Sequence, residues 1–242
     1  MSVNDLVLVQ GMHDTRLALE RWNREPWKVI RPWLLLSIGI AVLLLVAVFV
    51  IATLTTPDSS RYILPGVNSD ATISDYAHVL FRNSLVLALH AMACVAGFMA
   101  GSALPLSASH RSGVDRWVHE KAGRFAIVFV LCATAFSLCT QAYVIGSGAA
   151  TIAHQLGMSP GALILSLLPH ALPELVALFL PLAAWIVASR RDEWQDLLAA
   201  TAVTVAIAVP TLLAAAAVEI WVSPQIMLGL ATHNPPLLGG PY

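Results

Sequence analysis

Five long apolar stretches dominate this chain of 242 residues and limit what it can fold into. A helix needs about 20 apolar residues, rising about 1.5 Å each, to cross a hydrocarbon core of roughly 30 Å. Backbone polar groups in lipid must be satisfied within the spanning segment, so each stretch predicts a transmembrane helix. The expected fold class is therefore all-α, a polytopic integral membrane bundle of about five helices. The stretches lie at 33–54, 81–104, 125–146, 161–188 and 197–222.

Composition agrees with a membrane protein and argues against other classes. Hydrophobic residues make up 58% of the chain and charged residues only 11%, more apolar than a soluble domain of this length requires. A net charge of −1 and the lack of a large basic patch argue against nucleic acid as a partner. The sequence shows no nucleophile elbow, phosphate loop or HExxH zinc motif, so it leans against an enzyme and predicts no cofactor or metal.

Basic residues fall mainly on one side of the predicted membrane. Lys and Arg in short loops are retained on the cytoplasmic side, so the amino end is predicted to be cytoplasmic and the carboxyl end external. The implied location is a bacterial cytoplasmic (inner) membrane, with multiple passes. These groups are expected to meet anionic lipid headgroups, which makes the lipid bilayer the first predicted partner. They are Arg16, Arg21, Arg24, Lys28, Arg31, Arg111, Arg116, Lys121, Arg124, Arg190 and Arg191.

An amphipathic leader precedes the first apolar stretch. Trp22, Trp27 and Trp33 are typical of the headgroup level, and Pro26 and Pro32 are expected to break the leader helix before the membrane. The leader is expected to lie on the membrane surface, with docking of a partner as the alternative. The predicted parts are a cytoplasmic leader at 1–32, the transmembrane bundle at 33–224 and a short external tail at 225–242.

The largest external piece is the turn-rich, acidic segment 55–80. Its expected content is a loop and a short lead-in helix that begins at Ser74, where Ser caps the start and Asp75 favours the first turn. Surface exposure makes this segment the natural site for an extracytoplasmic partner.

Small residues recur every four positions in the second stretch, at Ala93, Gly97 and Gly101. Such a smooth stripe lets a neighbouring helix backbone approach closely. Close packing within the bundle is the expectation, and a homodimer face is the alternative.

Three prolines interrupt the fourth stretch, at Pro169, Pro173 and Pro181. Each lacks an amide hydrogen, so a bent or broken helix is expected, and a re-entrant entry over 161–168 stays open. Ser159 and Pro160 supply a helix start as cap and first-turn proline. The carbonyls expected to be left free are those near Leu165, Pro169 and Ala177.

Ionisable groups at membrane depth form the candidate site. His170 and Glu174 are spaced i and i+4, which stacks both side chains on one face of the fourth helix. Counting helix rise from the outer boundary places His90, Gln141 and Glu219 in the same outer half of the bundle. Charged groups at this depth are costly unless partnered, so the five residues predict a polar network or hydrated pocket.

Three kinds of chemistry fit this cluster. His90, His170 and a carboxylate could bind a divalent cation, although HxxxE lacks the second His of an HExxH zinc site. His170 and Glu174 could instead pass protons for a coupled transporter. The third interpretation is a hydrogen-bonded network that only holds the helices in register.

Short motifs add a resemblance to a known family. The letters FRNSL at 81–85, HALPEL at 170–175, and Glu219 shortly before Ser223 and Pro224 carry it. Over roughly 74–224 the chain resembles the stage II sporulation protein M family of bacterial membrane proteins, with Ala171 where a Gly is usual and Pro173 added. The family motif residues that carry over are Asn83, His170, Glu174 and Glu219.

The resemblance implies a non-enzymatic membrane component that works with other proteins. The leading hypothesis is a scaffold or permease-like subunit acting with envelope or membrane protein partners, with a homo-oligomer possible. One alternative is a proton- or cation-coupled transporter that uses the His/Glu pair, and another is an intramembrane metal-dependent hydrolase.

Overall fold

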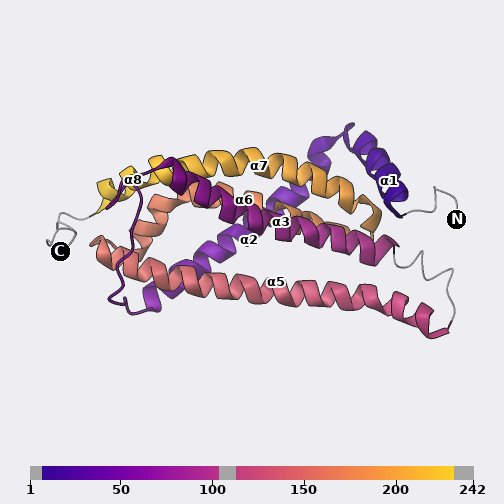
Figure 1. The fold of residues 1–242 in the computed structure, drawn as a ribbon, viewed down its shortest axis with the longest axis horizontal. Helices are drawn as coiled ribbons and strands as arrows, with labels where there is room; N and C mark the ends of the chain where they lie inside the picture. Colours follow the sequence, from indigo (N-terminus) through magenta and orange to yellow (C-terminus); the bar gives the residue numbers. More distant parts are fainter. Residues whose placement is uncertain (1–6, 104–112, 232–242) are drawn as a thin grey trace. The chain divides into compact units, whose positions relative to one another are not determined.

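The computed structural model describes residues 7–103 and 113–231, and within these ranges it is built of helices and contains no β-strand (Figure 1). The predicted all-α class is confirmed. A π-helical turn, η2 (Met99–Ala103), follows the third helix, and a 3-10 turn, η3 (Trp194–Asp196), precedes the seventh. The described α-helices are α1 (Val7–Trp22), α2 (Pro26–Leu54), α3 (Ile73–Phe98), α5 (Gly113–Gln155), α6 (Pro160–Arg191), α7 (Leu197–Trp221) and α8 (Ser223–Leu230).

Five helical segments of the described chain are long and apolar enough to cross a membrane. Each overlaps one of the five apolar stretches, so the predicted number of spans and the multi-pass character are confirmed. The segments are Pro26–Leu54, Ile73–Gly101, Val128–Gln155, Pro160–Arg191 and Trp194–Trp221.

The first span begins at Pro26, earlier than expected, because both Pro26 and Pro32 belong to the helix that forms it. Pro26 opens α2, where its missing amide and fixed φ suit the first turn. Pro32 lies inside α2, so the prediction that it breaks the helix is wrong. Its ring removes one backbone hydrogen bond near the helix start, and the buried Trp33 next to it packs edge-to-face on Trp22, with ring centroids 5.4 Å apart.

The start of α3 is capped by Thr72, which corrects the predicted cap at Ser74. The Asp75 amide donates to Thr72 Oγ1 at 3.2 Å, and the Thr72 amide donates back to Asp75 Oδ2 at 2.9 Å. This reciprocal pair satisfies two amides at the helix start in the manner of a capping box. The predicted role of Asp75 in the first turn is confirmed.

Helix α6 begins where the sequence predicts and continues through all three of its prolines. Ser159 Oγ accepts a hydrogen bond from the Ala162 amide at 3.2 Å, and Pro160 is the first helical residue. The helix is unbroken from Pro160 to Arg191, so of the two expected alternatives, bent or broken, the broken helix is excluded, and 161–168 is part of the same helix as the rest of the span.

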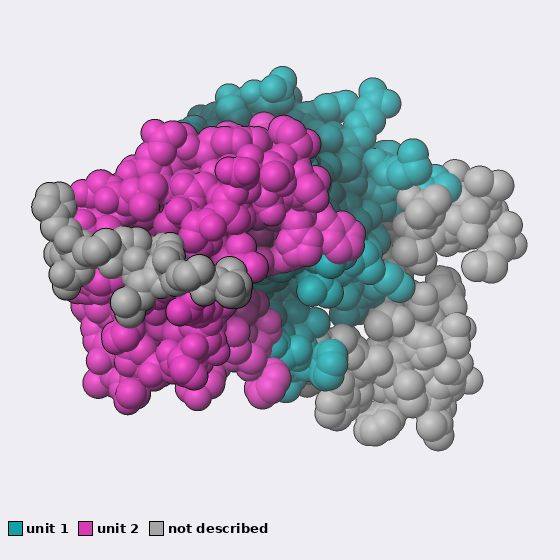
Figure 2. Space-filling model, turned by 60° about the vertical axis from the view of Figure 1, so that its left-hand side comes forward, with its two compact units in different colours: residues 1–37, 85–135, 177–209 teal, residues 38–84, 136–176, 210–242 magenta. Residues whose placement is uncertain are grey.

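The chain divides into two compact units (Figure 2). Each of the five spans contributes residues to both units. Unit 1 also holds α1 and η3, whereas unit 2 also holds the 55–72 loop and α8. Unit 1 comprises residues 1–37, 85–135 and 177–209, and unit 2 comprises residues 38–84, 136–176 and 210–242.

Unit 1 is held together by close contacts between small and large side chains. A Cβ placed on Gly97 would lie 2.5 Å from Trp185 Nε1, and one on Gly101 would lie 2.3 Å from the Trp194 ring. The predicted small-residue stripe, of which Ala93 is the half-buried third member, is therefore covered by tryptophans of the same chain. This contact takes the place that a second copy would need for a homodimer through Gly97 and Gly101.

Helix α1 packs on unit 1 rather than standing apart from it. A Cβ on Gly11 would meet Leu198 Cδ1 at 2.8 Å and Phe98 at 3.2 Å. At the other end of α1, Arg21 donates a short hydrogen bond to the buried carboxylate of Asp196 in η3. The leader is therefore anchored at both ends within this unit.

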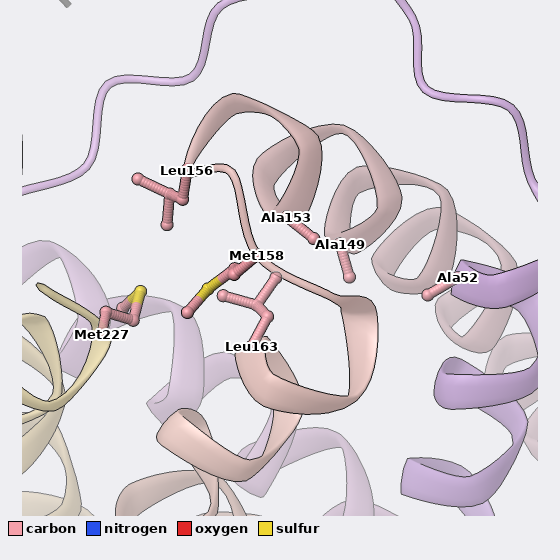
Figure 3. Packing of buried hydrophobic residues seen from close by; sticks show 7 residues of the cluster. All are labelled: Ala52, Ala149, Ala153, Leu156, Met158, Leu163 and Met227. Carbon is pink, nitrogen blue, oxygen red and sulfur yellow. The ribbon is translucent and has the colours of Figure 1, made fainter. Parts of the chain in front are cut away.

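The core of unit 2 gathers around the turn between α5 and α6 (Figure 3). Gly157 in this turn has a φ of 65°, a value that suits glycine, and it lets the chain reverse between Leu156 and Met158. In Figure 3 the Met158 and Leu163 side chains point toward Met227 of α8. The buried cluster is Ala52, Ala149, Ala153, Leu156, Met158, Leu163 and Met227.

Candidate functional site

The four residues carried over from the family motif all lie in unit 2, on three different helices. Asn83 comes from α3, His170 and Glu174 from α6, and Glu219 from α7. The Glu174 carboxyl interacts with the Asn83 side chain and, through space, with the Glu219 carboxyl. We call these four residues together with Ser223 the polar node.

A hydrogen bond joins α6 to the start of α8 within the polar node. His170 Nδ1 and Ser223 Oγ are 2.6 Å apart, and both side chains are buried. Ser223 opens α8, with Pro224 in the first turn. The sequence motif included Ser223 only because it precedes Pro224. Its hydrogen bond with His170 is visible only in the folded structure.

The polar node contains buried polar atoms without partners. Asn83 Nδ2 and Glu174 Oε2 are both shielded from solvent and have no hydrogen-bond partner among the described residues. The Asn83 amide therefore faces the Glu174 carboxyl without completing a well-formed hydrogen bond. A buried polar group left without a hydrogen bond costs about 1 to 3 kcal/mol of stability, and a charged group costs more.

Arg82 is a residue of this site that sequence reasoning missed. It precedes Asn83 on α3, its side chain is exposed, and its charge acts on both Glu174 and Glu219. Arg82 is visible in the FRNSL motif as a basic residue, yet only the fold places its charge near two carboxyls at once. The two carboxyls of the polar node therefore have one guanidinium, that of Arg82, at the exposed edge of the node.

Two residues predicted by depth have partners outside the node. His90 lies in unit 1, where Nδ1 donates to the Leu178 carbonyl at 2.8 Å and the ring lies 5.5 Å from that of Phe179. Gln141 lies in unit 2, and its amide donates to Ser137 Oγ one turn earlier on α5, at 3.0 Å. Counting helix rise fixes depth but not the direction in which a side chain points.

Within residues 7–103 and 113–231, no group of three or more His, Cys, Asp and Glu side chains is placed to hold a metal ion. His170, Glu174 and Glu219 do not form such a group despite their shared unit. The divalent-cation interpretation thus gains nothing from the geometry, and neither does the metal-dependent hydrolase built on it.

The 55–72 loop of unit 2 is fixed to α5 by paired hydrogen bonds. The Tyr62 amide donates to Gln155 Oε1 at 3.0 Å, and Gln155 Nε2 donates to the Tyr62 carbonyl at 2.9 Å. The Asp58 amide donates to Thr151 Oγ1 at 3.2 Å. Hydrogen bonds from Ser60, chiefly its backbone amide, hold the pKa of the exposed Asp58 carboxyl below its ordinary value of 3.8.

The same loop touches α8 next to the polar node. Gly66 has a φ of 78°, and a Cβ on it would lie 2.8 Å from Pro224 Cγ. Pro224 follows Ser223, which is hydrogen bonded to His170. A continuous series of contacts therefore runs from the 55–72 loop to the polar node, while Ile63 of the loop keeps 79% of its surface exposed.

No protein-family model, curated protein or solved structure matches this chain.

Proposed function

We propose that this protein is a non-enzymatic component of a bacterial cytoplasmic membrane, similar in kind to stage II sporulation protein M. It acts as a scaffold or permease-like subunit for other envelope proteins. The observation that carries the proposal is the polar node, since the motif residues behind the resemblance come from α3, α6 and α7 and share one site.

The route from the node to the 55–72 loop supports a role that depends on partners. The loop is held to α5 by four atoms of Tyr62 and Gln155 and rests on Pro224 through Gly66. A fixed loop loses little conformational entropy on binding, which favours protein recognition. Its exposed Ile63 supplies an apolar contact of the kind that anchors such interfaces.

Site-specific crosslinking tests this proposal. A photo-reactive amino acid at Ile63, in the full-length protein within native membranes, is expected to give a discrete protein-sized adduct. The matched control is Met12, which is similarly exposed but belongs to α1 of unit 1. The proposal fails if position 63 gives no adduct, or if both positions give the same products. A second result against the proposal would be native mass spectrometry, after mild extraction, that shows the chain without a bound protein.

A second candidate function is proton- or cation-coupled transport, favoured by the unpartnered Glu174 Oε2 beside a second carboxyl. Buried carboxyl groups that lack a fixed partner can take up a proton or a small cation. Glu174→Gln is expected to abolish coupled flux in proteoliposomes, and His90→Gln, outside the node, to leave it near the wild-type rate. Flux that persists in Glu174→Gln, or wild-type protein without flux, would refute this candidate.

A further inference from the structure

A cleft with charged walls lies in unit 1, where the end of α1 meets the start of α2 and the η3 turn. Its volume is about 530 Å³. Trp22 and Trp33, at the level where the first span begins, form one wall, and the side chains of η3 and the end of α6 form another. The lining residues are Arg21, Trp22, Glu25, Lys28, Val29, Trp33, Arg191, Glu193, Gln195 and Asp196.

An apolar groove of about 420 Å³ adjoins this cleft and shares Trp22, Val29 and Trp33 with it. Beyond the shared residues the groove is lined mainly by aliphatic side chains, including Leu19 and Val203. A polar cavity and an apolar one therefore lie next to each other beside a membrane-spanning helix. This is the shape that fits an amphiphile, with its headgroup in the cleft and a hydrocarbon chain in the groove.

The charges of the cleft are balanced, with three cationic and three anionic side chains. Arg21 is paired with Asp196, and Lys28 with Glu25 at 2.7 Å. Arg191 and Glu193 have no ion-pair partner among the described residues. The cleft thus offers one guanidinium and one carboxylate that are uncommitted.

We propose that this cleft and groove bind one phospholipid whose headgroup carries both a phosphate and a primary ammonium. Arg191 meets the phosphate as a charge-assisted, bidentate donor, and Glu193 accepts from the ammonium. One acyl chain lies in the groove, against Trp22, Val29 and Trp33. A purely anionic headgroup could pair with Arg191 but would leave the Glu193 carboxylate uncompensated, so the cleft favours the zwitterion.

Bound lipid would link the leader to the bundle. Arg21 on α1, Lys28 on α2 and Arg191 at the end of α6 face the same cleft. A headgroup seated there contacts all three elements, so it stabilises the packing of α1 on unit 1. The site therefore adds a lipid-dependent element to the protein that does not depend on the proposed function.

Native mass spectrometry of the full-length protein tests the proposal, with phosphatidylethanolamine, phosphatidylglycerol and phosphatidylcholine as separate probes. Phosphatidylethanolamine is expected to be retained most tightly. Arg191→Gln should weaken its retention about tenfold, in line with the loss of one hydrogen-bonded charge pair. The matched control is Arg190→Gln, which removes the same charge from an exposed neighbour that lines neither cavity.

The groove is tested separately by adding bulk. Val203→Phe should fill the groove and weaken retention of phosphatidylethanolamine, whereas Val209→Phe, on the exposed part of the same helix, should not. Unchanged melting in lipid-free detergent will show that Arg191→Gln and Val203→Phe remain folded. Equal retention of phosphatidylglycerol, or an equal loss in Arg190→Gln, would overturn the assignment. Retention of phosphatidylcholine at the level of phosphatidylethanolamine would exclude the ammonium contact with Glu193.

Discussion

In unit 1, α3 meets α6 through polar groups that find partners, whereas in unit 2 the same two helices meet through groups that do not. His90 donates to the Leu178 carbonyl at 2.8 Å, and the Cys94 thiol donates to the Pro181 carbonyl at 3.1 Å. In the polar node, Asn83 Nδ2 and Glu174 Oε2 are buried without partners among the described residues. The two regions share their helices, yet among the described residues only unit 2 buries a carboxyl oxygen without a hydrogen bond.

This difference in hydrogen bonding suggests which polar residues serve packing and which are candidates for a function. Satisfied polar contacts between membrane helices act as glue and contribute modestly to stability. A buried carboxyl at membrane depth is costly to keep, so Glu174 is a candidate for a role outside folding. Unit 1 has one similar exception within the described chain, Trp185 Nε1, but this neutral indole is held over Gly97 by shape. Five experiments can break or sharpen the comparison.

The largest effect is expected at the tight contact of unit 1. Gly97→Leu must displace Trp185 and Leu197, whose atoms lie 2.5 to 2.9 Å from where a Cβ on Gly97 would stand, and should lower the free energy of unfolding by about 3 kcal/mol. Gly39→Leu, where nothing lies within 4 Å, should leave it unchanged or raise it by up to about 1 kcal/mol, because leucine favours a helix more than glycine does. Unfolding in mixed micelles measures both. Equal effects would mean that the stripe is not a close-packed contact.

The next effect concerns the one satisfied pair of the polar node. Ser223→Ala removes the partner of His170 and should destabilise the protein by about 2 kcal/mol, since a buried ring nitrogen is left unpaired. Ser166→Ala is the control, because this buried serine donates only to the Leu163 carbonyl of its own helix, at 2.6 Å. The same unfolding measurement applies. If the two serine variants lost equal stability, the His170–Ser223 bond would not be a link between α6 and α8.

A smaller loss is expected where unit 1 is satisfied. His90→Leu removes the side-chain hydrogen bond to the Leu178 carbonyl and should lower the free energy of unfolding by about 1 kcal/mol. The apolar side chain recovers part of the packing on Phe179, which limits the loss. A gain in stability would show that His90 is as poorly matched as Glu174, and the comparison would fail.

The smallest effect lies in the 55–72 loop and depends on pH. The folded loop favours ionised Asp58, because Ser60 donates to its carboxylate and holds its pKa below 3.8. The stabilisation is therefore complete above pH 3.8 and is lost as the pH falls through the lowered pKa. Amide exchange at Ser60, corrected for intrinsic rates, should rise in that acid range. Asp58→Asn should remove this pH dependence, and an unchanged profile in Asp58→Asn would refute the assignment to Asp58.

Sequence patterns predicted the spans well because hydrophobic length is a property of each segment alone. Ser159 and Pro160 marked the start of α6 for the same local reason. Thr72 was missed as a cap because Ser74 lies two residues away and the signals overlap. Pro32 was misread because an interior proline removes only one backbone hydrogen bond and can kink a helix without ending it.

Tertiary placement limited the prediction of the site. Glu174, Asn83 and Glu219 were found through motif and spacing, and the fold does bring them together. His90 and Gln141 were chosen by depth, which leaves the direction around each helix undetermined. The contacts of Arg82 and the two cavities of unit 1 depend on several helices at once, so no single segment of sequence predicts them.

The stability of Glu174→Leu tests most directly whether the polar node is kept for function. Replacing an unsatisfied buried carboxyl by an apolar side chain of similar size is predicted to leave the free energy of unfolding unchanged or to raise it by about 1 kcal/mol. The crosslink at position 63 should weaken in the same variant. A loss of about 2 kcal/mol or more would instead mean that Glu174 is a structural residue and would contradict the account.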